Sequence, residues 1–396
     1  MNKFEKIICR KDTKCYKWDY LKEIFGRNDL LSMWVADMDF KAPAKVIEVL
    51  EKRVEHGVFG YTGLTDSFYS SIINWMKNRF NWHIEKDWIV TTPGIVPAIN
   101  FAIQTYTKKQ DKVLVQTPVY YPFFKSINNN KRTLINSELL LVSDRYEMNF
   151  PDLERQLSHD VEMMILCSPH NPVGRVWKKT ELQKVAELCL KHKVLLVSDE
   201  IHSDVVFSDN QHIPVPKISS EIAKNSITMF APSKTFNLAG LSISTVIIPN
   251  TELRQQFKNT LLKLGLHGGN LFGIEALEAA YKYGSSWLDQ LILYIEDNYK
   301  FIKQYIKKNI AKIKVIQMEG TYLLWLDCRE LKFTQKELVS FFINEAGLAL
   351  NDGDTFGKGG KGFMRMNLAC SRRLLKQALE QLTIAYNKLE KNNSTR

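Results

Sequence analysis

The sequence predicts an α/β fold with a mostly parallel sheet, and three apolar stretches that end in polar residues carry this prediction. One runs from Ser226–Phe230 to Lys234, a second is Val194–Glu200 with Asp199, and a third is Val161–Gly174 with Asn171. Each is typical of a buried strand that stops at a polar side chain. Parallel strands present their carboxyl ends at one edge of a sheet, so we expect the three side chains to meet at one ligand.

A lone Lys234 would ordinarily be a solvated loop lysine, because an ammonium group is strongly hydrated. A lysine that meets a carboxylate and an amide has a chemical use. Pyridoxal phosphate requires a lysine amine for its aldehyde, an anion facing its ring nitrogen and a donor to its phenolic oxygen. Lys234, Asp199 and Asn171 are therefore candidate residues for this cofactor.

The composition indicates an ordinary globular protein. The chain has 396 residues, 45% hydrophobic and 11% aromatic, enough for a large core and more than one domain. No apolar run approaches the ~18–20 residues of a membrane span, and the N-terminus MNKFEKIICRKD lacks the apolar block of a signal peptide. We therefore expect a cytoplasmic protein with no membrane partner. The six cysteines form no CxxC pair and no Cys/His spacing, so we expect free thiols and no metal site.

The formal net charge of +11 raises the question of nucleic-acid binding. The lysines are spread along the chain and alternate with glutamates, as in KVIEVLEKRVE, which is typical of solvated helix faces. A nucleic-acid site would cluster its positive charge and carry a recognisable binding motif. We expect no nucleic-acid partner.

Along the chain, a helix is expected to begin at Ala42-Pro43 and to stop at Gly57, before the glycine-rich loop that contains Tyr61. On residue type alone, Tyr61 is a loop aromatic with no assigned role. The turn at Gly94 leads from the strand-like Trp88–Val90 to the helical pattern Ile99–Tyr106. The backbone N–H groups after such a turn lie at the positive end of a helix dipole and can bind a phosphate.

Paired aromatics, Tyr120 and Tyr121, follow the strand Lys112–Gln116. On residue type alone they are more often core side chains than a platform for a cofactor ring. His202 lies three residues after Asp199 and is either a solvated turn histidine or a hydrogen-bond donor to the cofactor; we leave His170 unassigned.

The last third of the chain has a mixed pattern. It predicts a helix from Trp287 towards Ile310, strands Lys312–Gln317 and Thr321–Leu326, a helix near Gln335–Ala346, a loop Asn351–Gly362 and a strand Phe363–Leu368. This change predicts a large domain over residues 42–286 and a smaller one built from residues 1–41 and 287–396. Arg365 could pair with a structural carboxylate or with the carboxylate of a substrate. We expect the polar tail Lys388–Arg396 to be disordered.

Several motifs resemble those of one enzyme family. They are WVADMDF (34–40), GYTG (60–63), TPGIVPAI (92–99), TPVYYPFF (117–124), CSPHNPVGRVW (167–177), SDEIHSD (198–204), APSKTFNLAGL (231–241), GTYLLWLD (320–327) and FMRMNLA (363–369). Together they resemble the fold-type I pyridoxal-phosphate enzymes of the class I/II aminotransferase superfamily. Within that group they resemble the C–S β-lyases of the MalY/PatB type, which include cystathionine β-lyases and cystalysin.

The resemblance implies a large domain with a mostly parallel seven-stranded sheet, a smaller α+β domain, and a homodimer with shared active sites. It implies pyridoxal 5′-phosphate as cofactor and a small amino acid as substrate. It assigns catalytic roles to Lys234 and Tyr121. The implied cofactor-binding residues are Tyr61 (reaching the neighbouring subunit's cofactor phosphate), Gly94, Ile95, Val96, Tyr120 (stacking on the ring), Asn171, Asp199, His202, Ser233 and Lys234. The implied substrate-binding residues are Ala36, Tyr121, Asn171 and Arg365.

The chain departs from the wider aminotransferase pattern beside the lysine. Ala231 stands where those enzymes usually have a phosphate-binding serine, and Ser242 stands where they have an arginine. Phosphate binding then depends on Ser233, the Gly94 turn and Tyr61. The resemblance favours α,β-elimination from cystathionine or a related S-substituted cysteine, giving a thiol (homocysteine or hydrogen sulfide), pyruvate and ammonia. An aminotransferase, or a regulatory protein of this fold that acts through protein contacts, is the alternative.

Overall fold

The structure, a computed structural model, describes residues 3–266 and 268–394. A seven-stranded sheet forms its centre, in the order β2-β10-β9-β8-β7-β3-β4. These strands are β2 (Ile89–Thr92), β3 (Lys112–Val115), β4 (Thr133–Asn136), β7 (Val161–Cys167), β8 (Leu195–Asp199), β9 (Ser226–Phe230) and β10 (Ser244–Ile247). Strands β9, β8, β7, β3 and β4 are parallel, and β10 is antiparallel to both of its neighbours. The predicted mostly parallel seven-stranded sheet is confirmed.

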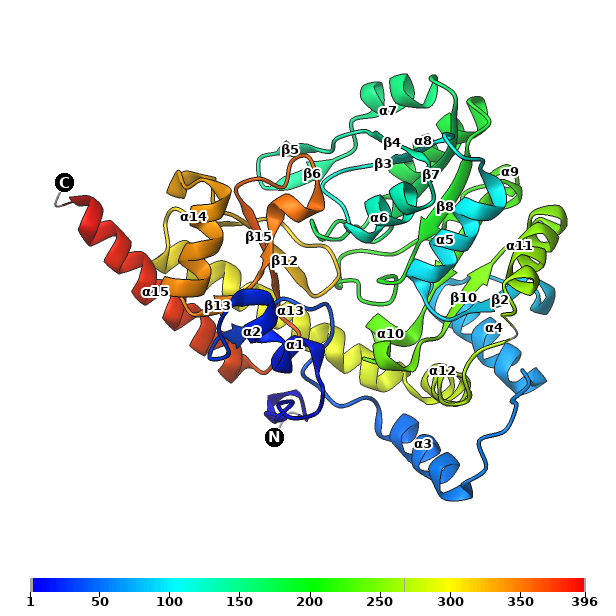
Figure 1. The fold of residues 1–396 in the computed structure, drawn as a ribbon, viewed down its shortest axis with the longest axis horizontal. Helices are drawn as coiled ribbons and strands as arrows, with labels where there is room; N and C mark the ends of the chain where they lie inside the picture. The colour runs from blue at the N-terminus through cyan, green and yellow to red at the C-terminus, as the bar shows by residue number, and fades with distance from the viewer. Residues whose placement is uncertain (1–2, 267, 395–396) are drawn as a thin grey trace.

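Helices cover both faces of this sheet, which explains why its central strands are apolar throughout (Figure 1). Successive residues of β7 alternate between the two faces: Met163 and Ile165 pack with α5 (Ile95–Tyr106), α6 (Pro122–Asn129) and α11 (Thr251–Lys263). Met164 and Leu166 pack with α7 (Phe150–Leu157) and α8 (Lys179–Lys191).

A second, four-stranded antiparallel sheet lies in the C-terminal part of the chain. Its strands are β11 (Lys314–Val315), β12 (Leu323–Asp327), β14 (Asn351–Asp352) and β15 (Phe363–Asn367). The N-terminal segment joins this part, because β1 (Leu31–Ser32) pairs in parallel with β13 (Leu348–Ala349). Figure 1 shows the N-terminal and C-terminal segments together on one side and the large sheet on the other. The domain division at residues 42 and 286 stays a prediction.

The other elements complete the chain. They are α1 (Tyr16–Asp19), α2 (Leu21–Phe25), α3 (Ala44–His56), α4 (Asp66–Phe80), β5 (Leu140–Val142), β6 (Arg145–Glu147), α9 (Ser220–Lys224), α10 (Pro232–Thr235), α12 (Leu271–Tyr283), α13 (Ser285–Asn309), α14 (Gln335–Ser340) and α15 (Arg372–Ser394). Helix α3 ends, as predicted, at Gly57, whose φ of 72° suits a residue without a side chain. Within residues 3–266 and 268–394, none of the helices combines the length and apolar character that crossing a membrane requires.

Several local predictions differ from the structure: β11 keeps only Lys314–Val315 of the predicted strand 312–317, and the predicted loop 351–362 begins with β14. Helix α5 begins at Ile95 rather than Ile99, because Pro97 lies in the first turn, where its missing N–H is not needed. The prediction of a disordered tail over Lys388–Arg396 is wrong for residues 388–394, because α15 continues to Ser394. Residues 395–396 lie outside the described residues. Ion pairs with distant residues hold this helix, Lys388 with Glu345 at 2.8 Å and Glu390 with Lys312 at 2.7 Å.

Candidate active site

A cavity of about 260 Å³ lies where β2, β7, β8 and β9 end. It is lined by Ala36, Pro93, Gly94, Ile95, Val96, Pro97, Tyr120, Cys167, Asn171, Asp199, Ile201, His202, Ser233, Lys234, Ala239, Ser242 and Ile243. Ten of the residues proposed from the sequence line this one cavity, since the turns after four strands of the sheet open at the same edge. Tyr61, Tyr121 and Arg365 are not among its lining residues.

Lys234 lies in the short helix α10, directly after β9. Its Nζ donates a hydrogen bond of 2.5 Å to the backbone carbonyl of Ala36, 198 residues away in the chain. Burial lowers the pKa of Lys234 to about 8; Arg365 adds to this effect, while Asp37 and Asp199 oppose it. An amine with this pKa exists partly as the free base near neutral pH, so it can react with an aldehyde and accept a proton.

Asp199 ends β8 and is buried, with a hydrogen bond of 3.1 Å from the Ile201 N–H to its Oδ1. Burial, with a contribution from Glu200, raises the pKa of Asp199 to about 7 despite that hydrogen bond and the nearby Lys234. A cationic N–H donor in the cavity would favour the charged carboxylate. The ring nitrogen of pyridoxal phosphate is such a donor, so Asp199 fits this cofactor.

His202 is buried, which excludes the solvated turn histidine considered from the sequence. Its Nδ1 has no hydrogen-bond partner in the described part of the chain, although buried polar atoms are rarely left unpaired. Burial, together with Lys234 and Arg365, lowers the pKa of His202 to about 3. The ring is therefore neutral at pH 7 and can donate one hydrogen bond to a cofactor oxygen.

The turn at Gly94 forms a cradle for an anion. Gly94 has a φ of 138°, a conformation that side-chain-bearing residues rarely adopt, and it precedes the first turn of α5. No side chain caps this helix start, and Ile95 and Val96 line the cavity. Their backbone N–H groups and the nearby Ser233 fit a phosphate group.

Arg365 lies on β15, beside the cavity-lining Asn171, and is almost fully buried. Its guanidinium donates to Asn171 Oδ1 at 3.0 Å, to the Trp34 carbonyl at 2.9 Å and to Asn351 Oδ1 at 2.5 Å. All three acceptors are neutral, and its Nε has no partner among the described residues. Burial lowers the pKa of Arg365 to about 10. A buried cation with neutral partners and an unused N–H suits an anionic ligand better than a structural ion pair.

Comparison with known proteins agrees with this geometry. The profile of the family described as aminotransferase class I and II matches residues 28–382. The chain belongs to this family. It is 41% identical to cystathionine beta-lyase PatB of Bacillus subtilis over 383 residues, which cover 96% of this chain and 99% of the relative. It is 33% identical to the protein MalY of Escherichia coli, with 96% and 97% of the two chains covered.

Solved structures of the family have the same fold. Cystalysin from Treponema denticola, which contains pyridoxal 5′-phosphate, superimposes with a TM-score of 0.95 at 40% identity, covering 98% of this chain and 99% of its own. The C–S lyase from Staphylococcus hominis, with pyridoxal phosphate bound, has a TM-score of 0.90 at 30% identity and 97% coverage of both chains. The resemblance to C–S β-lyases is confirmed.

Two tyrosines proposed from the family lie outside the cavity. Tyr121 packs beside Tyr120, with 5.5 Å between the ring centres, and against Phe356 at 6.1 Å. Tyr61 is fully exposed, so within a single chain of this family member it contributes nothing to the cavity. Both roles stay predictions.

The structure also brings residues to the site that the sequence left unassigned. Tyr322 is buried and donates a hydrogen bond of 3.2 Å to the Ala36 carbonyl, the same oxygen that Lys234 contacts. Cys167, Ala239 and Ser242 also line the cavity. Tyr322 belongs to the quoted motif GTYLLWLD, so its position in a family motif was the available signal.

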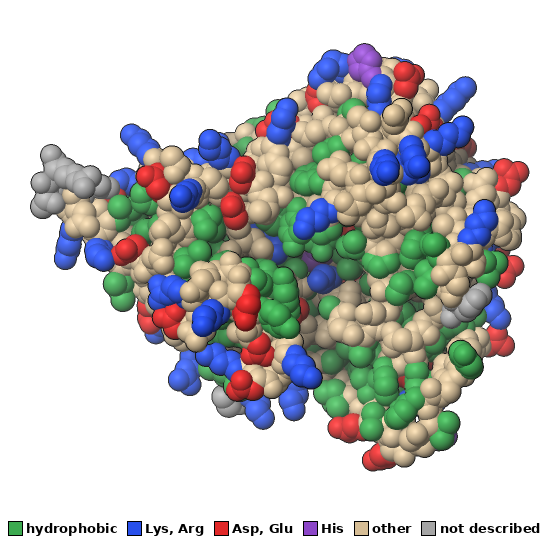
Figure 2. Space-filling view, viewed as in Figure 1, with side chains coloured by type: hydrophobic (Ala, Val, Ile, Leu, Met, Phe, Trp, Pro, Cys, Tyr) green, Lys and Arg blue, Asp and Glu red, His purple; other side chains and the backbone are tan. Residues whose placement is uncertain are grey.

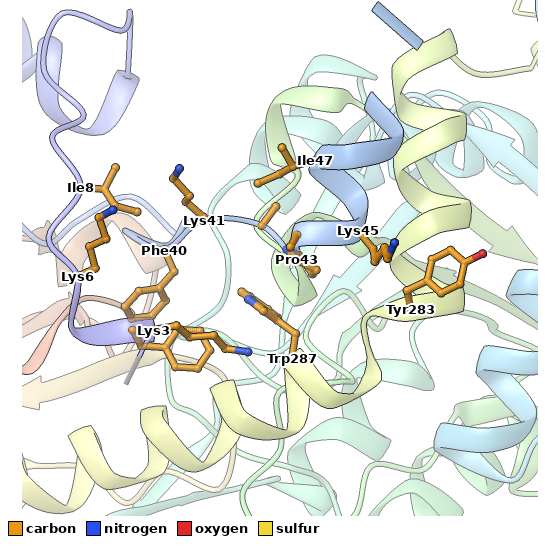
Figure 3. A pocket seen from close by; sticks show the side chains of 13 residues that line it. Lys3, Lys6, Ile8, Phe40, Lys41, Pro43, Lys45, Ile47, Tyr283 and Trp287 are labelled. Carbon is orange, nitrogen blue, oxygen red and sulfur yellow. The ribbon is translucent and has the colours of Figure 1, made fainter. Parts of the chain in front are cut away.

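A larger cavity, of about 550 Å³, lies between the N-terminal segment, the start of α3 and the start of α13 (Figure 3). Aromatic side chains and lysines dominate it: Phe4, Phe40, Tyr283 and Trp287, with Lys3, Lys6, Lys41 and Lys45. Its lining residues include neither a carboxylate nor an amide side chain. It therefore lacks the residue set that distinguishes the cavity around Lys234.

Proposed function

We propose that the protein is a pyridoxal-phosphate-dependent C–S β-lyase that acts on cystathionine or a related S-substituted cysteine. The observation that carries this proposal is the meeting of a lysine of lowered pKa, a buried carboxylate and an unpaired buried histidine nitrogen in one cavity. Two relatives of more than 30% identity bear the names cystathionine beta-lyase PatB and MalY, and two similar structures are a cystalysin and a C–S lyase.

Binding of the cofactor follows from the residues that line the cavity. Lys234 would attach the aldehyde, Asp199 would accept the ring N–H, and His202 would donate to the phenolic oxygen. Tyr120 would stack on the ring, and Asn171 would contact both cofactor and substrate. The N–H groups of Ile95 and Val96, with Ser233, would hold the phosphate. When bound, pyridoxal phosphate supplies an electron sink for the bond to Cα that breaks.

The protein's own groups then perform the elimination. Arg365 binds the substrate carboxylate through its free Nε, and Ala36 and Tyr121 border the same substrate. The Lys234 amine, held near Cα, removes the α-proton. The Cβ–S bond breaks and its electron pair leaves with sulfur, which takes up a proton and departs as a thiol. Water then converts the remaining three-carbon unit into pyruvate and ammonia.

A homodimer with shared active sites is part of the proposal. Tyr61 and its neighbours Val58 and Phe59 are exposed, as are Val54 and Tyr283. Figure 2 shows hydrophobic side chains gathered on one face over the region of α3 and α12. Such a face supports association with a second copy, which would bring Tyr61 to the neighbouring cofactor phosphate.

The domain division and the location belong to the same proposal. Residues 42–286 form the cofactor-binding domain, and residues 1–41 with 287–396 form the smaller one; the pairing of β1 with β13 supports this division. All six cysteines are free thiols and four are buried, which suits the reducing conditions of the cytoplasm.

The test is a product assay with L-cystathionine. We expect equal amounts of pyruvate, ammonia and homocysteine, measured by lactate dehydrogenase coupling, ammonia assay and thiol titration. Cysteine, cystine and other thioethers, assayed in parallel, would rank the substrates. Fast amino transfer from alanine or aspartate to a keto acid, without thiol release, would show that the protein is an aminotransferase instead.

A further inference from the structure

Segment 34–40 passes beside Lys234 without forming a helix or strand. Side chains from distant parts of the chain hold its backbone instead. Asn367 on β15 donates to the carbonyls of Val35 and Asp37, each at 2.6 Å. Asn237 accepts from the Met38 N–H at 2.9 Å and donates to the Met38 carbonyl at 2.9 Å and to that of Phe40 at 2.8 Å. The course of this segment therefore depends on side-chain contacts rather than on regular secondary structure.

The carbonyl of Ala36 is the point where this segment meets the active site. It accepts the hydrogen bond of 2.5 Å from Lys234 Nζ and that of 3.2 Å from the Tyr322 hydroxyl. Because a hydrogen bond weakens steeply with distance and angle, a small shift of the segment would release the amine.

An ion cluster from the N-terminal segment fastens the other side of segment 34–40. Arg10 forms two parallel hydrogen bonds to Asp37, at 2.6 and 2.9 Å, and contacts Asp39 at 2.7 Å. Lys17 lies 2.9 Å from Asp39 and 3.7 Å from Asp37. Lys17 is 1% exposed and Arg10 20% exposed, so solvent screens these pairs only weakly. Two positive and two negative charges make the cluster neutral, and none of the four residues lines the cavity.

Charges from several elements act on the Lys234 amine. Asp37 and Asp199 favour its cationic form, whereas Arg365 disfavours it. His202 also lies within reach of this field. Of these groups, Asp37 is paired with two oppositely charged side chains, Arg10 at 2.6 Å and Lys17 at 3.7 Å.

We propose that Arg10 and Asp37 are positioning residues for Lys234. The ion cluster fixes segment 34–40 so that the Ala36 carbonyl receives the Lys234 amine, and the opposition of Arg10 to Asp37 sets the electric field at that amine. This role rests on the proposed function of Lys234 and adds to it two residues that do not line the cavity.

Because Arg10 and Asp37 carry opposite charges, replacing one or the other should shift the pKa of Lys234 in opposite directions. Asp37→Asn removes a negative charge while keeping the shape of the side chain, so the pKa of the Lys234 amine should fall. Arg10→Met leaves Asp37 less neutralised, so the same pKa should rise. Each change in the pKa of Lys234 should amount to about half a pH unit or more. The double variant should return towards the wild-type value, and Arg10→Lys should stay closer to it than Arg10→Met.

The measurement is the pH dependence of reductive methylation of Lys234 in the full-length, cofactor-stripped protein, followed by peptide mass spectrometry. Circular dichroism would verify the fold of each variant. Arg145→Met is the matched control: Arg145 is 22% exposed and holds the buried Glu319 at 2.9 Å, but it belongs to β6 and neither of its ion-pair partners, Glu319 and Glu147, is part of segment 34–40. We expect the Lys234 pKa to be unchanged in this variant. In the cofactor-loaded protein, the pH midpoint of the visible absorbance should shift with the same signs.

Shifts in the same direction for Asp37→Asn and Arg10→Met would overturn the electrostatic part of the proposal, and unchanged pKa values in both variants would overturn it altogether. Those results would leave the proposed function intact. Attachment of the cofactor to a lysine other than Lys234 in the wild-type protein would instead refute the proposed function, so the two failures are distinguishable.

Discussion

Replacement of Arg365 by Met tests the proposed substrate site most directly, because Met has similar length and no charge. Burial lowers the pKa of Arg365 from 12.5 to about 10, which corresponds to about 3 kcal/mol against the buried charge at about 1.4 kcal/mol for each pH unit. A substrate carboxylate that pairs with this guanidinium removes that penalty. Loss of such a desolvated pair typically weakens binding by about 2–5 kcal/mol.

We therefore expect Arg365→Met to lower kcat/KM for L-cystathionine by about 30-fold to several thousand-fold, at about 1.4 kcal/mol per factor of ten. The free energy of unfolding should change little, because two effects oppose each other. Removing the buried charge stabilises the protein, whereas losing the hydrogen bonds to Asn171, Trp34 and Asn351 destabilises it. The melting temperature should shift by less than about 4 °C. Arg365→Lys keeps the charge but not the planar fork, so its kcat/KM should lie between those of the wild type and Arg365→Met.

Steady-state kinetics and calorimetry on the three proteins would decide the matter. A kcat/KM within about threefold of wild type for Arg365→Met, equivalent to less than about 0.7 kcal/mol, would refute the substrate role. A large fall in melting temperature would show that Arg365 is a structural residue instead.

Three further predictions concern the cofactor, the dimer and pH. Borohydride reduction and peptide mapping should place the cofactor on Lys234, and Lys234→Ala should retain none covalently; label on another lysine would contradict the assignment. Mixed Tyr61→Phe and Lys234→Ala subunits should recover activity, because one site of each hybrid dimer is intact; no recovery after verified subunit exchange would argue against a shared site. The pKa of Asp199 rises from 3.8 to about 7 on folding, so the cofactor-free protein should lose up to about 4 kcal/mol of stability as the pH rises from about 4 to about 7. Asp199→Asn should remove this loss. In denaturant unfolding, the variant should therefore gain more free energy of unfolding over the wild type at pH 8 than at pH 5. Equal gains at the two pH values would contradict the raised pKa of Asp199.

The sequence by itself determined the sheet and the residues at its carboxyl edge. The predicted strand Ser226–Phe230 has the same bounds as β9, and Lys234, Asp199 and Asn171 line one cavity. This was possible because apolar runs report burial locally, and because parallel strands necessarily bring their ends to a common edge. The Gly94 turn could be predicted for a similar reason, because the N–H groups that fit a phosphate belong to the backbone of consecutive residues.

Only the tertiary structure decided which polar groups are buried and what they contact. His202 could have been solvated or buried on sequence grounds, because a position three residues after Asp199 does not determine exposure. The contact between Lys234 and the Ala36 carbonyl joins residues 198 positions apart, and its geometry depends on Asn237, Asn367 and the ion cluster. The tail was mispredicted because Lys388 and Glu390 are polar in composition, yet partners at Glu345 and Lys312 hold them in a helix. Composition records how polar a side chain is, whereas the distance to its partner arises only when the chain folds.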